Sequence, residues 1–292
     1  MREYCTLNGD LIAPQGRQGD FAKDRGLAYG HGLFETILYR KSELPLKGRH
    51  LERICRDAKV LGIPIQAQQL DIYLNQLKHT LKGDAITEGV IKLIVTAGAG
   101  GRGYGPPAQV EPLVICSYSP WPEDLPKQWL EGISVRCCNH RLSHNRVLAG
   151  VKHLNRLDQV LARSEWTCTT YDEGLMICSQ GKLIEAISAN VFINIDGSWF
   201  TPALTDAGVS GVMRSLLLKQ VFADSKLHAK VASIDIKELN KCQEMFICNS
   251  IRGIIPVTQI YSADGVLIKS LPRGEQTLML RKRLVSNYPH YQ

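Results

Sequence analysis

The sequence predicts an α+β or mixed α/β fold with two domains. Strand-like and helix-like segments alternate irregularly, and tight-turn signals place hairpins beside helices, which argues against a doubly wound parallel sheet. The 292 residues suffice for two domains of ordinary size. Residues 119–126 are rich in proline and polar side chains. We therefore expect a smaller α/β domain over residues 1–118, a linker over 119–126 and a larger domain over 127–292.

The expected N-terminal domain begins with a strand and hairpin over residues 1–20, because Asn8 and Gly9 form a tight-turn dipeptide between apolar residues. Apolar residues at helical spacing predict an amphipathic helix over residues 50–61. Arg53 lies beside its apolar stripe and points either inward or into solvent. The other predicted elements are strands over residues 34–39, 90–96 and 113–117 and a helix over residues 68–82.

The expected C-terminal domain carries most of the strands. Asp264 and Gly265 predict a hairpin near the end of the chain. Helices are expected after Lys152, after Gly211, up to Leu239, and at the C-terminus. The predicted strands cover residues 133–138, 173–178, 183–184, 191–195 and 244–248.

Composition narrows the class of protein. The net charge of +7 suits an anionic ligand, but the basic residues are scattered without a basic run, which argues against nucleic-acid binding. Nine cysteines in apolar surroundings form no metal motif and favour a reducing compartment. No signal peptide and no apolar run of membrane-spanning length is present. We expect a cytoplasmic protein with no metal site and no membrane partner.

Lys152 is the first candidate for chemistry. It follows the small, apolar residues 149–151 and precedes a predicted helix, which Asn155 could cap with Asp158 three positions later. Poor solvation lowers the pKa of an ammonium group and makes the amine a nucleophile or base. The alternative is an ordinary solvated lysine at a helix entrance.

Two further features lie beyond Lys152. Glu185 stands in an apolar run, where a carboxylate either finds a positive or hydrogen-bonding partner or lies at a strand edge. Gly208 and Gly211 precede a helix, whose free N–H groups can bind an anion, although many helices begin this way.

A glycine-rich loop is the last candidate. In residues 97–105, five glycines surround Arg102 and Tyr104. The loop is either simply flexible or leaves both side chains free to meet a ligand carboxylate, which an arginine can bind through two hydrogen bonds.

These features match one cofactor when they are taken together. Pyridoxal 5'-phosphate needs a lysine for a Schiff base, an acid facing its ring nitrogen and a cup for its phosphate. Lys152, Glu185, Arg53 and the glycine-led helix offer these parts.

The chain also resembles the fold-type IV family of pyridoxal-phosphate enzymes, which includes branched-chain and D-amino-acid aminotransferases. The similarity runs from about residue 29 to residue 256. The motifs that carry it, in the order of the family, are residues 29–35, 50–54, 185–192, 208–214 and 249–256. Within the family, residues 100–104 and 152–160 are most similar to the aminodeoxychorismate lyases. Branched-chain aminotransferases instead have a glycine pair before the asparagine.

The resemblance implies roles in binding the cofactor. Lys152 would hold pyridoxal phosphate, and Glu185 would keep its ring nitrogen protonated. The phosphate contacts it implies are the Arg53 side chain, the backbone N–H groups of Val212 and Met213, and the Ser250 hydroxyl.

The resemblance also implies roles in binding the substrate. Arg102, with Tyr104, would bind a carboxylate, and Asn155 and Arg156 would line the pocket. His31 stands where many relatives have aspartate, and it receives no role.

The expected activity is therefore conversion of aminodeoxychorismate to 4-aminobenzoate and pyruvate, in folate biosynthesis, by a homodimer. The first alternative is a branched-chain or D-amino-acid aminotransferase of the same fold. The second is a cofactor-free binding protein, against which the presence of Lys152, Glu185 and Arg53 argues.

Overall fold

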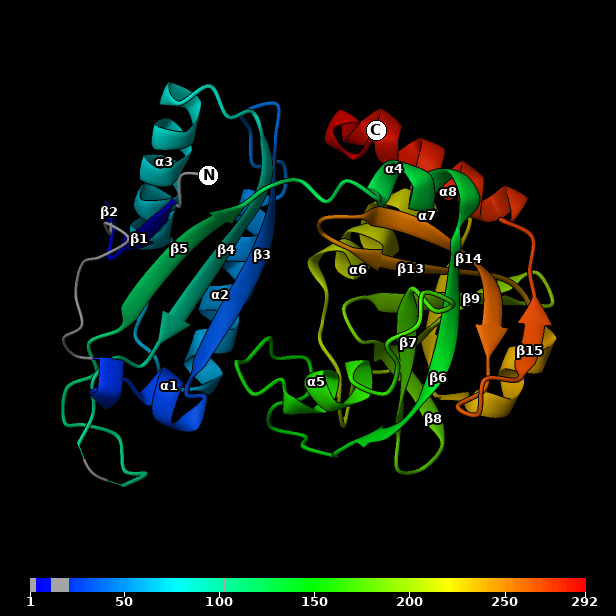
Figure 1. Cartoon of the computed structure of the whole chain (residues 1–292), viewed down its shortest axis with the longest axis horizontal. Coiled ribbons are helices and arrows are strands. Elements are labelled where there is room, and N and C mark those ends of the chain that lie inside the picture. The colour runs from blue at the N-terminus through cyan, green and yellow to red at the C-terminus, as the bar shows by residue number, and fades with distance from the viewer. Residues whose placement is uncertain (1–3, 12–20, 102) are drawn as a thin grey trace. The chain divides into compact units, whose positions relative to one another are not determined.

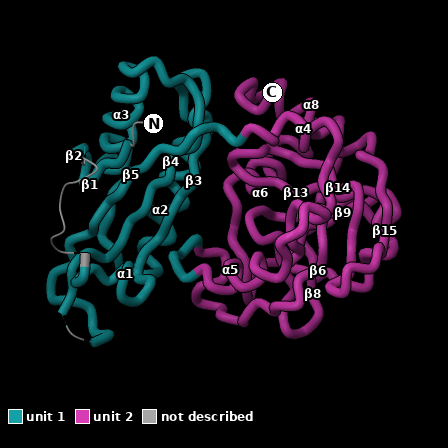
Figure 2. The backbone as a smooth tube through the Cα atoms, in the orientation of Figure 1, with its two compact units in different colours: residues 1–122, 152–155 teal, residues 123–151, 156–292 magenta. Residues whose placement is uncertain are grey.

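The computed structural model of the protein describes residues 4–11, 21–101 and 103–292. The chain forms two compact units (Figure 2). Unit 1 comprises Met1–Pro122 and Lys152–Asn155, and unit 2 comprises Glu123–Val151 and Arg156–Gln292. The short segment Lys152–Asn155 thus belongs to unit 1, although both flanking segments belong to unit 2. The domain boundaries expected from the sequence stay a prediction.

Unit 1 is built on one antiparallel sheet of order β2-β1-β5-β4-β3, visible in Figure 1. Helix α2 packs against β3, and α3 packs against β5 and α2. The elements are β1 (Cys5–Leu7), β2 (Asp10–Leu11), η1 (Phe21–Lys23), α1 (Arg25–Tyr29), β3 (Gly32–Arg40), α2 (Lys47–Val60), α3 (Ala67–Gly83), β4 (Glu88–Thr96) and β5 (Leu113–Ser119).

The apolar spacing of the two long helices explains how they cover this sheet. In α3 the buried residues recur every three or four positions, which is one face of a helix. In α2 the buried face carries Leu51, Ile54 and Ala58, together with three polar residues that are taken up below. Both helices and the strands β3, β4 and β5 confirm the elements predicted for these residues.

The first hairpin is also confirmed. Asn8 and Gly9 both have positive φ, at 49° and 91°, as a tight two-residue turn between twisted strands requires. Thr6 pairs with Leu11. The part of the prediction that falls on residues 12–20 lies outside the described residues.

Unit 2 contains a ten-stranded mixed sheet of order β11-β10-β9-β13-β14-β6-β7-β8-β12, with β15 paired to β14. Strand β6 runs parallel to both neighbours, and β10 runs parallel to β11. The strands are β6 (Ile133–Leu142), β7 (Glu173–Cys178), β8 (Lys182–Ala186), β9 (Asn190–Ile195), β10 (Ser198–Pro202), β11 (Ala229–Ala232), β12 (Ile234–Asp235), β13 (Cys242–Asn249), β14 (Gly253–Tyr261) and β15 (Leu267–Ser270).

The helices of unit 2 are mostly short. Those that match predicted helices are α5, α6 and α8, and the predicted helical stretch up to Leu239 is the 3₁₀ helix η3, capped by Asp235 and Glu238. The helices are α4 (Leu125–Glu131), α5 (Leu157–Arg163), α6 (Val212–Leu216), the π-helical η2 (Leu217–Val221), α7 (Phe222–Asp224), η3 (Ile236–Lys241), α8 (Glu275–Asn287) and η4 (Pro289–Tyr291).

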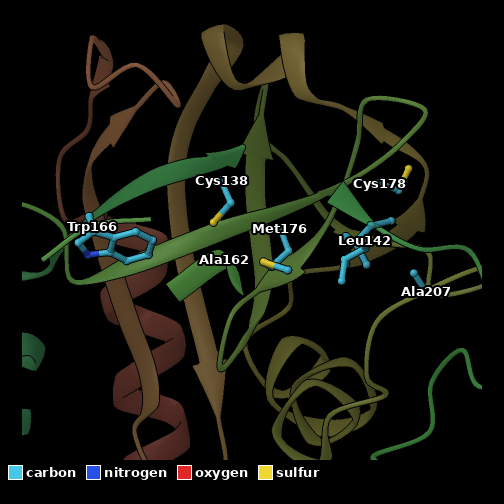
Figure 3. Close-up of a cluster of buried hydrophobic side chains, with 8 residues drawn as sticks. Cys138, Leu142, Ala162, Trp166, Met176, Cys178 and Ala207 are labelled. Carbon is cyan, nitrogen blue, oxygen red and sulfur yellow. The ribbon is translucent and has the colours of Figure 1, made fainter. Parts of the chain in front are cut away.

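Small and sulfur-containing side chains fill one part of the core of unit 2. Figure 3 shows this cluster, which includes Trp166 and Met176. Its buried residues are Cys138, Leu142, Ala162, Trp166, Met176, Cys178, Ile184 and Ala207. Six of the nine free cysteines are buried, whereas Cys5 and Cys55 are half-buried and Cys168 is exposed. Most of the cysteines are therefore buried, in keeping with their apolar neighbours in the sequence, whereas Cys168 is not.

The predicted cap of the helix after Lys152 is wrong. Helix α5 begins at Leu157 with Arg156 as its N-cap residue and no side-chain cap. The Asn155 side chain instead donates from Nδ2 to the carbonyl oxygen of Gly30, at 3.1 Å. A partner distant in sequence has replaced the local cap, and this ties Asn155 to unit 1.

Among the described residues, no helix is both long enough and apolar enough to span a membrane.

Gly98, just after β4, offers a test of the backbone of unit 1. Its φ is +71°, and a Cβ there would lie 1.9 Å from the carbonyl oxygen of Glu111. We expect Gly98→Ala to lower the free energy of unfolding by about 2–4 kcal/mol, measured by urea denaturation. Gly101→Ala, where a Cβ meets nothing within 4 Å, is the matched control. Equal stability of the two variants would contradict this account.

Candidate active site

A buried ionic cluster links β3 to α2 in unit 1. Glu35 and His50 are fully buried, and Arg53 is 6% exposed. Arg53 donates from Nε to Glu35 Oε1 at 2.8 Å and from Nη2 to Glu35 Oε2. His50 Nδ1 lies 2.6 Å from the same Oε2. Arg53 therefore points inward, one of the two orientations that the sequence left open.

This cluster sets the charge of its members. Burial alone would raise the pKa of Glu35, but the charge of Arg53 and the hydrogen bonds from Arg53 and His50 outweigh burial and lower that pKa from 4.5 to about 2. Burial lowers the pKa of His50. His50 is then neutral near pH 7, with a proton on Nδ1 that is donated to Glu35. Its Nε2 atom has no hydrogen-bond partner among the described residues.

The backbone of Lys152 is fixed on both sides within unit 1. Its N–H donates to Asp57 Oδ2 at 3.0 Å, and its carbonyl oxygen accepts from the N–H of Phe34 at 3.1 Å. Asp57 is buried and belongs to α2, one turn beyond Arg53. The half-buried Lys152 places Nζ 4.0 Å from the centre of the Phe34 ring. The backbone of Lys152 is thus anchored to the same pair, α2 and β3, that carries Arg53 and Glu35.

The glycines of residues 26–32 allow the segment Lys152–Asn155 to lie close. A Cβ on Gly30 would lie 2.2 Å from Asn155 Oδ1. The N–H of Leu154 donates to the carbonyl oxygen of Gly32 at 2.9 Å. The density of glycines seen in the sequence therefore reflects close approach of a second backbone.

The glycine-rich loop presents Tyr104 to solvent. Tyr104 is 85% exposed, and its ring centre lies 5.3 Å from that of Tyr29. The Tyr104 side chain is thus open to a ligand, as the sequence allowed. Arg102, the predicted carboxylate ligand, lies outside the described residues.

In unit 2, the Glu185 carboxylate is 3% exposed on β8. Its Oε2 accepts from the N–H of Val209 at 2.8 Å, and the Val209 carbonyl oxygen accepts from Asn190 Nδ2 at 2.9 Å. The hydrogen-bonding partner that the sequence demanded of Glu185 is thus a backbone N–H. A solvated position at a strand edge is ruled out by burial, since Glu185 is 3% exposed although β12 pairs only with Leu183 and Lys182 of β8.

Glycines also shape the start of α6. Gly211 is the N-cap residue, and a Cβ there would lie 2.0 Å from Asn190 Oδ1. Val212 and Met213, both buried, form the first turn, whose N–H groups have no acceptor within the helix. This arrangement can hold an anionic group.

The remaining predicted residues of unit 2 are Ser250, which lies in a turn, and Arg156, the N-cap residue of α5. Ser250 follows Asn249, whose Oδ1 accepts from the N–H groups of Ile251 and Arg252 at 3.0 and 2.8 Å. The Tyr291 hydroxyl donates to the Ser250 carbonyl oxygen at 2.9 Å, and this hydrogen bond helps to hold the turn in place. Arg156 donates from Nη2 to the carbonyl oxygen of Val151 at 2.9 Å.

Sequence reasoning missed three residues that hold Lys152 and Arg53 in place: Glu35, His50 and Asp57. His50, Arg53 and Asp57 are spaced at i, i+3 and i+7, which places them on one helix face. Three polar residues on the apolar face of a helix are a signal that could have found them. Glu35 within an apolar strand is the same kind of signal.

Groups of three or more metal-ligating side chains do not occur in the part of the chain that the structure describes.

Comparisons with known proteins agree with this geometry. Residues 32–260 match the family model described as amino-transferase class IV. An aminodeoxychorismate lyase from Vibrio harveyi is 32% identical over 89% of this chain and 94% of its own. A putative branched-chain-amino-acid aminotransferase from Methanocaldococcus jannaschii is 28% identical over 89% of this chain and 88% of its own.

A solved structure gives the same result. The crystal structure of 4-amino-4-deoxychorismate lyase from Pseudomonas aeruginosa superposes with a TM-score of 0.86 at 36% identity, over 97% of this chain and 99% of the other. The predicted α+β, fold-type IV architecture is confirmed.

The ionic cluster makes stability depend on pH. Because the pKa of Glu35 is lowered to about 2 in the folded state, its contribution is complete above pH 4.5 and is lost as the pH falls toward 2. We expect that loss to be on the order of 3 kcal/mol, measured by urea unfolding between pH 5 and pH 3 and extrapolated. Glu35→Gln should flatten this slope. The exposed Glu131→Gln is the control, and equal slopes in Glu35→Gln and wild type would contradict the assignment.

Proposed function

Because the chain belongs to the class IV aminotransferase family, we propose that it is a pyridoxal-phosphate-dependent lyase. Its substrate is 4-amino-4-deoxychorismate, and its products are 4-aminobenzoate and pyruvate. The relatives from Vibrio harveyi and Pseudomonas aeruginosa support the substrate, since both are described as lyases for it. The observation that carries the proposal is the anchoring of Lys152 by both of its backbone groups, beside a buried arginine.

The residues present fit pyridoxal phosphate. The buried Glu185 keeps one hydrogen bond to a backbone N–H and is the acid that a pyridinium nitrogen requires. A side chain at Gly211 would collide with Asn190. Because Gly211 is the N-cap residue of α6 and has no side chain, it does not cover the N–H groups at the start of this helix. Arg53, Val212, Met213 and Ser250 are the proposed phosphate ligands. When bound, the cofactor supplies an electron sink for the charge released at the substrate.

Lys152 performs two tasks in this proposal. Its amine would hold the cofactor between turnovers, and once freed by the substrate amine, Nζ would accept the proton from C4 of the substrate ring. The C3–O bond would then break and the ring would become aromatic. The released enolpyruvate would take up a proton at its methylene carbon to give pyruvate. Because the backbone of Lys152 is tied to Asp57 and Phe34, its side chain swings about a fixed Cα.

The substrate-binding residues of the proposal come from loops. Arg102 and Tyr104 bind a carboxylate, and Asn155 and Arg156 line the pocket. The exposed Tyr104 supports this role, since its side chain is available to a ligand. A homodimer and a cytoplasmic location, in folate biosynthesis, complete the proposal.

A branched-chain or D-amino-acid aminotransferase is the competing function, because an aminotransferase is among the similar proteins. The two functions need the same cofactor but different substrates. Any cofactor-free function requires that the purified protein bind no pyridoxal phosphate.

The test supplies aminodeoxychorismate to the purified holoenzyme and follows both products. We expect 4-aminobenzoate and pyruvate in equal amounts, and a loss of at least about a thousandfold in Lys152→Ala, from which the proton-transferring amine is gone. Lys92→Ala, which removes the other lysine that lies over the Phe34 ring, is the control. Amino transfer to 2-oxoglutarate without either product would establish the aminotransferase instead.

A further inference from the structure

A buried arginine holds the backbone of the glycine-rich loop. Arg25 is 4% exposed at the start of α1. It donates from Nη1 to the carbonyl oxygens of Gly103 and Gly105, at 3.3 and 3.1 Å, and from Nη2 to that of Tyr104, at 2.8 Å. One guanidinium thus binds three successive carbonyl groups. A Cβ on Gly100 would lie 2.6 Å from Arg25 Cδ, so the loop also needs glycine to pass the arginine.

His31 completes the set of Arg25 partners. Arg25 Nε donates to His31 Nδ1 at 3.2 Å, so Nδ1 carries no proton. The imidazole proton is then on Nε2, which lies 2.8 Å from the carbonyl oxygen of Leu61 and donates to it. Leu61 is the C-cap residue of α2, the helix that carries Arg53. This chain of hydrogen bonds connects the loop to α2 through His31.

Among the described residues, no carboxylate contacts the guanidinium of Arg25. The partners of Arg25 among the described residues are three carbonyl oxygens, one imidazole nitrogen and the ring of Tyr29, all of them neutral. The adjacent Asp24 directs its oxygens to the N–H of Leu27 and the hydroxyl of Thr96 instead. A buried cation normally has a carboxylate partner, so its absence here calls for an explanation.

We propose that Arg25 is a fixed positive charge under residues Gly103–Gly105 that attracts the anionic substrate, and that His31 positions the loop without cancelling this charge. The inference rests on the proposed function, whose substrate carries two carboxylates. Four of the five N–H groups of Arg25 already donate to these partners, so Arg25 acts through its field and through the loop backbone. Arg25 and His31 are therefore positioning and specificity-determining residues.

Two substitutions of His31 distinguish an effect of charge near Arg25 from an effect of the hydrogen bond that His31 accepts from Arg25. His31→Asp places a negative charge next to the guanidinium, and His31→Asn offers a neutral acceptor. Lys230→Gln, an exposed site in unit 2, changes the net charge by the same amount as His31→Asp and is the matched control. Steady-state lyase kinetics at low and high salt, and calorimetric titration with 4-aminobenzoate, measure the effect.

We expect His31→Asp to raise KM about tenfold with kcat reduced less than about twofold, and to weaken 4-aminobenzoate binding in parallel. Added salt should shrink this difference. His31→Asn should change KM by less than about threefold. A KM for His31→Asp equal to that of Lys230→Gln, or equal effects of the Asp and Asn variants, would overturn the proposed role of charge.

A second pair of variants guards against failure of His31→Asp to fold. Arg25→Gln removes the charge, and Arg25→Lys restores it with fewer hydrogen bonds. KM should rise with Gln and recover in part with Lys, whereas equal KM values in both would overturn the proposal. Wild-type protein that forms no 4-aminobenzoate would instead refute the proposed function, on which this inference rests. Wild-type turnover with an unaffected KM in His31→Asp would refute the inference alone.

Discussion

The buried ion pair between Glu35 and Arg53 is the interaction on which the rest of unit 1 depends. A buried guanidinium that loses its carboxylate is strongly unfavourable, so Arg53 can stay inside only because Glu35 faces it. Since the two residues lie on β3 and α2, the pair also fixes how the helix lies on the strand. That placement brings Asp57 to the backbone of Lys152. The proposed catalytic lysine is thus held by a cluster that never needs to react.

Unit 2 positions its proposed ligands in a different way. Glu185 Oε2 accepts from the N–H of Val209, and Asn190 Nδ2 donates to the carbonyl oxygen of the same residue. The missing Cβ of Gly211 lets Asn190 approach the start of α6. Nearby, burial lowers the pKa of Arg214, which binds Thr201 and Pro202. Backbone hydrogen bonds and the lack of a Cβ at Gly211 therefore help to position Glu185 and the start of α6 within unit 2.

Much of the fold could be predicted from the sequence, because the apolar spacing of a helix or a strand depends only on residues that are close in the chain. The helix that carries Arg53, the apolar strand around Glu185 and the tight turn at Asn8 all follow from such patterns. The cap assigned to Asn155 failed because its partner, Gly30, lies 125 positions away. Local patterns mark Glu35 and Asp57 as polar residues in apolar surroundings, but their partners Arg53 and Lys152 lie 18 and 95 positions away. No local rule reveals which distant backbone or charge a polar side chain will meet.

Reductive trapping of the cofactor tests the central claim most directly, namely that Lys152 is the lysine that carries pyridoxal phosphate. The holoenzyme is treated with borohydride, digested and mapped by mass spectrometry, so that the modified lysine is identified without any assumption about the reaction. We expect the pyridoxyl group on the peptide that contains Lys152. A pyridoxyl group on a different lysine, or unmodified protein after loading with cofactor, would contradict the account.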